Sequence, residues 1–291
     1  MSEILGIDVS HHNGKIDWAK VAKSGKKFTI LKCQYEAQSH RIDECFEYNY
    51  SESGNNGLAR GVYIYIARAS MADPKADAES LEQIDKGSIN LGKFKDAESL
   101  LKHLNGRKLE YGIWLDLEDK TVDVKGKQYI RDLAYQYANI FKQAGYYVGI
   151  YCNKDWYTRL IHDDLKRDFD FWIARYPSVD NGYYNTLSAL KPIYNGVVAW
   201  QYSSKGKVDG IQGNVDLNVD YDGIINLSTP KVNISYPKPT RTLKYGDKGD
   251  DVKWLQSKLN EHSASLVIDG SFGRKTEEAV KKFQTECFVN G

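Results

Sequence analysis

Short apolar runs alternate with longer amphipathic stretches along most of this chain. The short runs are rich in β-branched and aromatic residues, which is typical of buried strands. We expect such strands at residues 4–9, 28–34, 62–66, 112–119, 147–152, 169–175, 197–202 and 215–220. Between them, apolar residues recur three or four positions apart, which predicts helices that pack one face on a core. We expect these helices at residues 16–23, 43–60, 72–105, 128–145 and 154–166.

The order of these elements predicts the fold class. Strands joined mostly by helices indicate an α/β protein of the (β/α)8 barrel type, in which roughly 250 residues form one domain. The connections shorten toward the last strands, so we expect a TIM-like barrel that is irregular at its end. In such barrels the catalytic groups lie at the carboxyl ends of the strands.

A composition change near residue 228 separates a second, smaller part of the chain. Residues 228–240 hold three of the six prolines and show no periodicity, so we predict a linker there. Beyond it, Val252, Leu255 and Leu259 recur at helical spacing, and a second helix is expected at residues 276–283. The predicted domains are therefore 1–227, a barrel, and 241–291, a small and mainly α-helical unit with few apolar anchors.

Charge and composition exclude several classes of protein. Forty Lys and Arg against 39 Asp and Glu give a net charge of +1, so no field of one sign favours nucleic acid. No stretch approaches the roughly 20 apolar residues of a membrane span, and the first residues lack a secretory pattern. We therefore expect synthesis in a cytoplasm and no stable membrane insertion. The four scattered cysteines form no Cys-x-x-Cys pair, which predicts free thiols rather than a zinc site. The sequence implies no metal and no organic cofactor.

Candidate chemistry is concentrated in the stretch from Gly112 to Asp119. Three apolar residues in it alternate with Asp116 and Glu118, so both carboxylates share one face of the predicted strand, about 6.5 Å apart along the backbone. Glycoside hydrolysis needs one carboxyl group as acid and a second group that stabilises the developing cation. Asp8 and Asp216 also lie late in or just after apolar runs. Four acids are therefore expected to converge at the mouth of the barrel, the opening formed by the carboxyl ends of its strands. Like charges at such distances raise at least one pKa.

An ordered set of motifs resembles glycoside hydrolase family 25, the Chalaropsis-type lysozymes of bacteria, fungi and many phage endolysins. The motifs extend from residue 4 to about 225 and lie at residues 6–10, 16–18, 61–63, 115–118, 171–176, 200–202 and 215–218. The C-terminal part resembles a type 1 peptidoglycan-binding domain, through residues 246–252, 255–256, 269–273, 276, 279–280 and 283–284. It ends before the final Gly-x-x-Thr segment of such domains, so we expect a shortened version.

The resemblance implies hydrolysis of the β-1,4 bond between N-acetylmuramic acid and N-acetylglucosamine in bacterial peptidoglycan. It implies that Glu118 is the general acid, that Asp116 assists the 2-acetamido group or stabilises the transition state, and that Asp8 and Asp216 are supporting acids. The substrate-binding residues that it implies are Tyr63, Tyr65, Tyr176, Trp200 and Gln201. A lysozyme joined to a wall-binding domain is typical of an endolysin, made in the host bacterial cytoplasm without a signal peptide and acting on the wall. The oligomeric state stays open.

Two other interpretations remain. A chitinase-like barrel of family 18 also carries acids two residues apart on the fourth strand, but Gly112 and Trp114 stand where its longer acidic motif requires acids. A non-catalytic wall-binding protein would use the barrel as a lectin. Such a protein has no need for four mutually repelling carboxylates at one site, and a wall-lysis assay separates the two possibilities.

Overall fold

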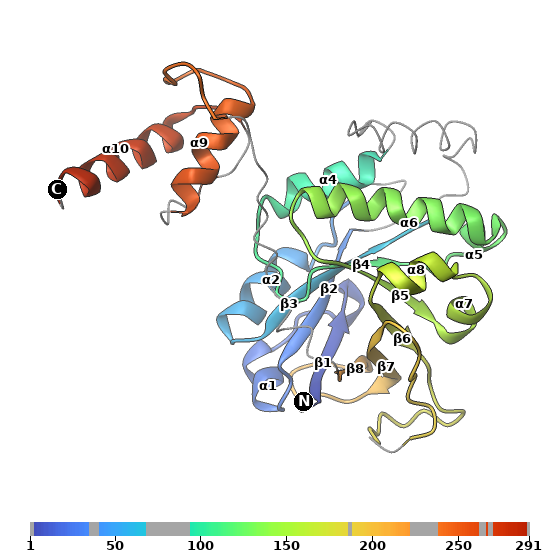
Figure 1. The fold of residues 1–291 in the computed structure, drawn as a ribbon. Helices are drawn as coiled ribbons and strands as arrows, with labels where there is room; N and C mark the ends of the chain where they lie inside the picture. Colours follow the sequence, from blue (N-terminus) through green and yellow to red (C-terminus); the bar gives the residue numbers. More distant parts are fainter. Residues whose placement is uncertain are drawn as a thin grey trace. The chain divides into compact units, whose positions relative to one another are not determined.

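The computed structural model describes residues 3–34, 41–67, 94–185, 188–221, 238–261, 266 and 270–289. The chain divides into two compact units, of which the first comprises residues 1–102 and 108–232 and the second residues 103–107 and 233–291. In the first unit, eight strands follow one another around a closed barrel (Figure 1). The predicted fold class is therefore confirmed.

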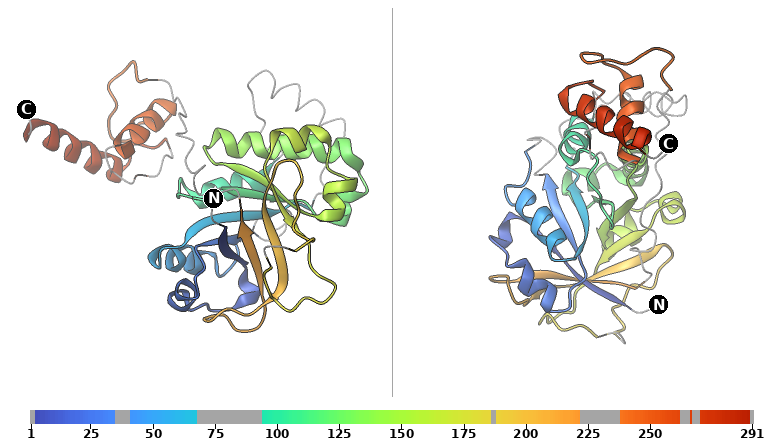
Figure 2. Two further views of the ribbon diagram at one scale, coloured as in Figure 1. Left: turned by 60° about the horizontal axis from the view of Figure 1, so that its bottom comes forward. Right: turned by 90° about the vertical axis from the view of Figure 1, so that its left-hand side faces the viewer.

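The strands of the barrel are short and mostly buried. They are β1 Ile4–Val9, β2 Phe28–Gln34, β3 Ala59–Tyr65, β4 Ile113–Asp116, β5 Val148–Asn153, β6 Phe171–Ala174, β7 Val197–Gly206 and β8 Val215–Asp220. The helices of this unit are a 3-10 turn at His11–Asn13, α1 Trp18–Lys23, α2 Phe46–Asn55, α4 Lys95–Leu104, α5 Lys120–Asp123, α6 Gly126–Gln143, α7 Lys154–Arg159 and α8 Asp163–Asp168. Figures 1 and 2 show them outside the barrel, with α2 over β2 and β3 and α6 over β4 and β5.

Two predicted helices differ from the structure. The helix expected at residues 154–166 is two helices, α7 and α8, because the side chain of His162 accepts a hydrogen bond from the Asp164 amide and caps a new helix. The helix expected at residues 43–60 is shorter, because Ala59 already pairs in β3. Of the stretch expected to be helical at residues 72–105, α4 is confirmed, and residues 72–93 lie outside the described residues.

The last strand runs against the direction expected for a (β/α)8 barrel. Strands β1 to β7 pair in parallel, whereas β8 is antiparallel to both β7 and β1. The connection at residues 207–214 is too short for a parallel crossover, which needs about a dozen residues. Asp216 therefore lies at the amino end of β8, and its expected place at a carboxyl end is wrong. It still reaches the mouth, because the register sets it opposite Asp8.

Aromatic side chains fill the interior of the barrel below its mouth. Trp114 and Trp172 meet edge to face with ring centroids 5.9 Å apart, and Phe28 stacks on Tyr111 at 4.2 Å. Gly6 is needed opposite Phe28, because a Cβ atom there would lie 2.5 Å from the ring. On β1 and β4 the next inward positions along the strand are acids. The barrel is thus a packed core closed by a polar upper layer.

The second unit is small, as expected. It contains α9 Asp250–Glu261 and α10 Arg274–Val289. Its apolar anchors include the buried Val252 and Leu259, and its turn is held by the buried amide of Gln256, which accepts a hydrogen bond from the Gly270 amide at 2.9 Å. The predicted linker at 228–240 falls mostly outside the described residues.

Candidate active site

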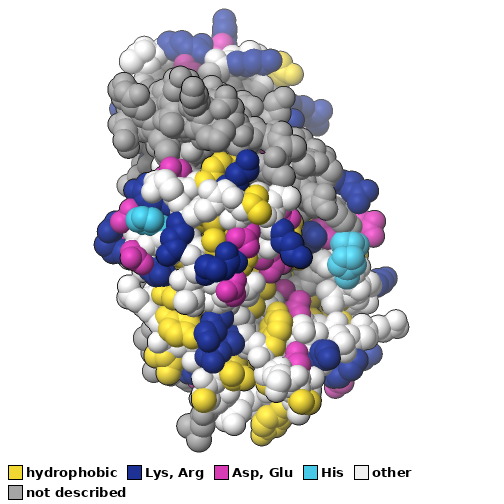
Figure 3. Space-filling model, turned by 90° about the vertical axis from the view of Figure 1, so that its right-hand side faces the viewer, with side chains coloured by type: hydrophobic (Ala, Val, Ile, Leu, Met, Phe, Trp, Pro, Cys, Tyr) yellow, Lys and Arg dark blue, Asp and Glu magenta, His cyan; other side chains and the backbone are white. Residues whose placement is uncertain are grey.

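Four acids converge at the mouth of the barrel. Asp8 comes from β1, Asp116 ends β4, Glu118 follows two residues later, and Asp216 comes from β8. Asp8 and Asp116 are 7% and 5% exposed, whereas Asp216 is half-buried and Glu118 reaches solvent. Figure 3 shows acidic side chains gathered near the middle of one face of the molecule, with basic side chains around them.

Glu118 lies on a short, fixed piece of backbone between a strand and a helix. Strand β4 ends at Asp116, and Asp119 caps α5 by accepting a hydrogen bond from the Thr121 amide at 2.8 Å. The hydroxyl of Tyr65 donates to the other carboxylate oxygen of Asp119, also at 2.8 Å. Glu118 is therefore held in place by its neighbours on both sides while its side chain faces the mouth.

Asp8 is held by two side-chain amides. Its Oδ2 atom accepts hydrogen bonds from Gln201 Nε2 and from Asn218 Nδ2, both at 2.8 Å. The Asn218 Oδ1 atom in turn accepts from the indole Nε1 of Trp172 at 2.8 Å. Three elements distant in the sequence thereby fix the orientation of one carboxylate.

Both the nitrogen and the oxygen of the Gln201 amide take part in this network. Its Oε1 atom accepts hydrogen bonds from the hydroxyls of Tyr151, at 2.8 Å, and of Tyr176. Gln201 is 3% exposed, and Tyr176, at 39%, has the most exposed ring among them. Tyr176 thus joins the rim of the mouth to the buried Asp8 through one amide.

The pKa of every acid in the mouth is raised. Burial is the main cause for all four, and it raises the pKa of Asp216 to about 6. The charge of Asp216 adds to the effect on Asp8, and the charge of Glu118 adds to the effect on Asp116. Although Glu118 reaches solvent, the walls of the mouth shield its carboxyl group, and the charge of Asp216 raises its pKa further. Such shifts let carboxyl groups hold protons well above their ordinary range.

Asp116 differs from Asp8 in its hydrogen bonding. Its Oδ1 atom is buried and has no hydrogen-bond partner in the described part of the chain. A buried acceptor of this kind is costly unless a donor reaches it. Asp116 thus holds a buried acceptor that the described part of the chain leaves unsatisfied.

The predicted binding residues do not all lie at the mouth. Tyr63 is half-buried on β3, and the charges of Asp8 and Asp116, after burial itself, raise the pKa of its phenol, so it faces the acids. Trp200 does not share this position. It is 2% exposed, packs against Tyr184 and Tyr202, and donates its indole N–H to the backbone oxygen of Arg175.

Sequence reasoning missed several groups at this site. Lys32 lies two positions beyond Ile30 and four beyond Phe28, so it shares their inward face of β2. Its charge partly offsets the rise in the pKa of Asp116. That period of two was a usable signal. Trp172 and Asn218 lie within the family motifs, but the sequence predicts no site role for either, because their roles depend on contacts between distant strands.

The described residues contain no group of three or more His, Cys, Asp or Glu side chains that could hold a metal ion. Among the described residues, Cys33 and Cys152 are buried and Cys45 is half-buried, and none of the three is in a disulfide, as expected. Within the described ranges, no helix is both long and apolar enough to cross a membrane.

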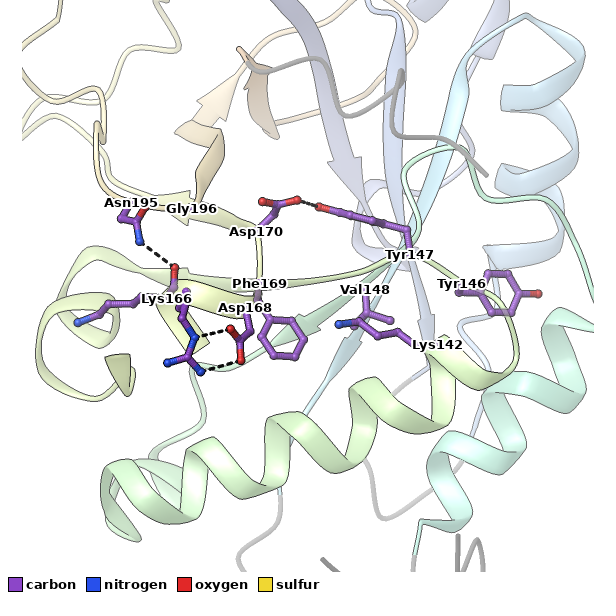
Figure 4. Close-up of a pocket in the computed structure, with 11 residues that line it drawn as sticks. Lys142, Tyr146, Tyr147, Val148, Lys166, Asp168, Phe169, Asp170, Asn195 and Gly196 are labelled. Atoms are coloured by element: carbon purple, nitrogen blue, oxygen red, sulfur yellow. Dashed lines mark hydrogen bonds and ion pairs between the residues drawn. The ribbon is translucent and has the colours of Figure 1, made fainter. Parts of the chain in front are cut away.

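A cavity of about 430 Å³ lies at the other end of the barrel, near the amino ends of β5, β6 and β7 (Figure 4). Its charged groups already have partners. Asp170 accepts a hydrogen bond from the Tyr147 hydroxyl at 2.6 Å, Arg167 pairs with Asp168, and Lys142 lies over the ring of Phe169. Charge pairs at this end of a barrel serve stability rather than chemistry, so the mouth is the candidate active site.

A closed α/β barrel with two carboxylates at the end of its fourth strand and two more beside them is the architecture of a glycoside hydrolase. The chain belongs to the glycosyl hydrolases family 25, whose family model matches residues 7–211. A model of a peptidoglycan binding domain matches residues 248–287. The chain is accordingly a lysozyme-type glycoside hydrolase whose substrate is peptidoglycan.

Similar proteins agree with this placement. The chain is 26% identical over 289 residues to the autolytic lysozyme of Clostridium acetobutylicum, covering 96% of this chain and 72% of that protein. It is 26% identical to lysozyme M1 of Streptomyces globisporus over 75% of this chain and 67% of that one. The modular autolysin LytC from Streptococcus pneumoniae, solved with a synthetic peptidoglycan ligand, is 28% identical with a TM-score of 0.55, over 75% of this chain and 47% of LytC. A bacterial lysozyme from Streptomyces coelicolor shares the fold, with a TM-score of 0.55 at 20% identity, over 81% of this chain and all of that one.

Proposed function

We propose that this chain is an N-acetylmuramidase in which Glu118 is the general acid and Asp116 assists the 2-acetamido group of the substrate. The observation that carries this assignment is the contrast between the two residues. Glu118 has a raised pKa and faces the mouth, where an acid must hold a proton and deliver it. Asp116 is buried and offers an unpaired Oδ1 atom, which suits the N–H of an acetamido group.

The reaction follows from these two roles. Glu118 gives its proton to the glycosidic oxygen as the bond between that oxygen and the anomeric carbon breaks. The acetamido oxygen of N-acetylmuramic acid bonds to the anomeric carbon, while Asp116 accepts a hydrogen bond from the acetamido N–H and stabilises the positive charge that develops there. Water then attacks the same carbon and breaks the new bond. Glu118 takes the proton of that water, so one water is consumed and the acid is restored.

The other acids and the tyrosines complete the proposed site. Asp8 and Asp216 support the charge distribution at the floor of the mouth. Tyr63 and Tyr176 offer phenol groups to the sugar, and Tyr65 acts on the Glu118 segment through Asp119. We do not extend a sugar contact to Trp200, because its ring and its N–H are already engaged within the protein.

The domain organisation belongs to the same proposal. We propose a catalytic barrel at residues 1–227, a linker at 228–240 and a wall-binding unit at 241–291. A hydrolase joined to a wall-binding unit concentrates the enzyme on its polymer. This pairing fits an endolysin that is made in the cytoplasm of a host bacterium and acts on its wall.

The test is the release of fragments from purified Gram-positive cell walls by the wild type and by Glu118→Gln. The wild type should release fragments with muramic acid at the new reducing ends, identified by mass spectrometry. Loss of the general acid should lower the rate by roughly 10²–10⁴-fold, while cosedimentation with walls stays unchanged. Wall binding by the wild type without release of sugar would favour the non-catalytic alternative, and glucosamine reducing ends would assign a different bond.

A further inference from the structure

The network around Asp8 determines where a proton can sit on that residue. The indole N–H of Trp172 is only a donor, so the atom of Asn218 that faces it must be the amide oxygen. The amide nitrogen of Asn218 then points at Asp8, and Oδ2 of Asp8 must accept its hydrogen bond. Gln201 donates to the same oxygen. A proton on Asp8 is thereby confined to Oδ1.

We propose that Asn218 and Gln201 are positioning residues that keep Asp8 as the proton-carrying member of its pair with Asp216, and so hold the negative charge on Asp216 beside Glu118. This inference rests on the proposed function of Glu118. Asp8 and Asp216 lie opposite one another in the antiparallel pairing of β1 and β8, and the neighbouring Asp216 side chain raises the pKa of Asp8. With Oδ2 of Asp8 occupied by two N–H groups, Oδ1 is left to donate to Asp216.

Burial determines which member of the pair is neutral. Asp8 is 7% exposed, whereas Asp216 is half-buried and closer to solvent, so a charge costs less on Asp216. The pKa directions agree, since the hydrogen bond to the partner raises the pKa of Asp8 and lowers that of Asp216. Other charged groups act on these acids: Asp180 after β6 raises the pKa of Asp216, Asp119 raises that of Glu118, and Lys32 on β2 lowers that of Asp116. The phenols of Tyr63 on β3, Tyr151 on β5 and Tyr176 after β6 also face the acids, whose charges raise the pKa of each phenol.

The consequence for the reaction lies at Glu118. The negative charge of Asp216 raises the pKa of Glu118, which keeps the general acid protonated. A series of contacts therefore runs from Trp172 through Asn218, Asp8 and Asp216 to Glu118. If the Asn218 amide rotates by half a turn, its nitrogen no longer faces Asp8. Asp216 then loses the hydrogen bond from Asp8, takes up a proton more easily and no longer raises the pKa of Glu118. The alkaline limb of the activity profile then moves to lower pH.

Two tryptophans provide a matched pair of variants. Trp172→Phe removes the N–H that orients Asn218. Trp114→Phe removes an N–H that also donates at 2.8 Å, but to the backbone oxygen of Tyr111. Both side chains are buried and pack on each other, so the loss of packing is similar. Asn218→Asp is the stronger variant, because it exchanges the N–H donor for an oxygen that competes for the proton of Asp8.

The first readout is the pH profile of wall clearing by the full chain. In Trp172→Phe the alkaline limb should move down by about 0.5–1 pH unit, which is a threefold to tenfold loss of kcat at a fixed pH on that limb, with KM for walls unchanged. Trp114→Phe should keep the wild-type limb. An unchanged limb in Trp172→Phe, or the same displacement in both variants, overturns the proposal.

The second readout does not depend on activity. Titration of ¹³C-labelled aspartate carboxyl groups by NMR should show a group that titrates well above the ordinary range and disappears in Asp8→Asn. The Asp216 signal should titrate at higher pH in Trp172→Phe and Asn218→Asp, and unchanged in Trp114→Phe. If Asn218→Asp does not fold, Trp172→Phe carries the test. If these NMR shifts are seen but Glu118→Gln releases wall fragments as the wild type does, the role of Glu118 is rejected and the positioning network is kept. If the wild type is active and Glu118→Gln is not, but the NMR shifts are absent, the network alone is rejected.

Discussion

The two ends of the barrel carry similar residue types and treat them in opposite ways. At the mouth, burial raises the pKa of Asp8, Asp116 and Asp216, and the charge of at least one nearby carboxylate raises each of them further. Near the cavity at the other end, Asp164 and Asp168 have lowered pKa values, because the side chains of Arg131 and Arg167 bind them directly. The difference lies in burial and partners rather than in the number of acids. Buried acids without cationic partners, whose pKa values are raised, indicate the active site, whereas acids paired with cations have a structural role.

The largest expected effect comes from changing one acid at each end. Asp116→Asn should lower kcat for wall fragments on the order of 10²–10³-fold, because the acetamido group loses an anionic partner. Asp168→Asn should keep wild-type activity, since that carboxylate serves Arg167 and Tyr135 at the surface. Fragment release measured by mass spectrometry gives both values. Equal losses in the two variants would remove the functional distinction between the ends of the barrel.

A smaller effect is expected on the pH dependence of stability. The pKa of Asp216 is raised to about 6 in the fold, so its contribution to stability is complete below its unfolded value near 4 and is lost as pH rises through about 6. Asp216→Asn cannot ionise and should escape this loss. Thermal melts at pH 4 and pH 7 should show a smaller decline for the variant, by on the order of 1 kcal/mol after allowing for solvent at this half-buried group. An equal decline in stability from pH 4 to pH 7 in the wild type and in the variant would mean that ionisation of Asp216 does not destabilise the fold.

The smallest effect is expected at the opposite end, with the opposite sign. Arg131 and, to a smaller extent, Arg167 lower the pKa of Asp164, and Arg167 lowers that of Asp168, so these pairs stabilise the fold above the unfolded pKa of aspartate and cease to do so as pH falls. Arg167→Gln should lower Tm slightly at pH 7 and not at pH 3, with wall clearing intact, because exposed ion pairs contribute little. A loss of wall clearing in this variant would show that the ion pairs at this end of the barrel affect catalysis at the mouth, against the proposed separation.

Most of the barrel could be predicted because its strands are short apolar runs with clear limits. The bounds of β1, β2 and β8 match the expected ones. The direction of β8 could not be derived from its apolar pattern, because alternation specifies which face is buried and not which way the strand runs. That is why Asp216 was expected at the wrong end of its strand and was still expected at the right mouth.

The acids could be found from sequence, whereas the groups that orient them could not. Asp8, Asp116 and Glu118 stand where apolar runs end, which is a local signal. Asn218 binds a carboxylate 210 positions earlier, and nothing local reveals such a contact. Trp200 and Gln201 are adjacent, and only the latter reaches the network. The register of β7 shifts against both β6 and β8, so which of the two side chains points into the barrel depends on strand pairing rather than on local sequence.

The reversed last strand also affects how this enzyme can be altered. In a regular (β/α)8 barrel, a connection leaves one strand at the mouth and must return to the base before the next strand begins. Here the connection at residues 207–214 starts and ends at the mouth, because β8 is antiparallel to β7. Lengthening or replacing it changes one wall of the catalytic opening without passing the base of the barrel. This hairpin is thus a place where substrate range can diversify, in nature or by loop grafting, while the rest of the scaffold keeps its sequence.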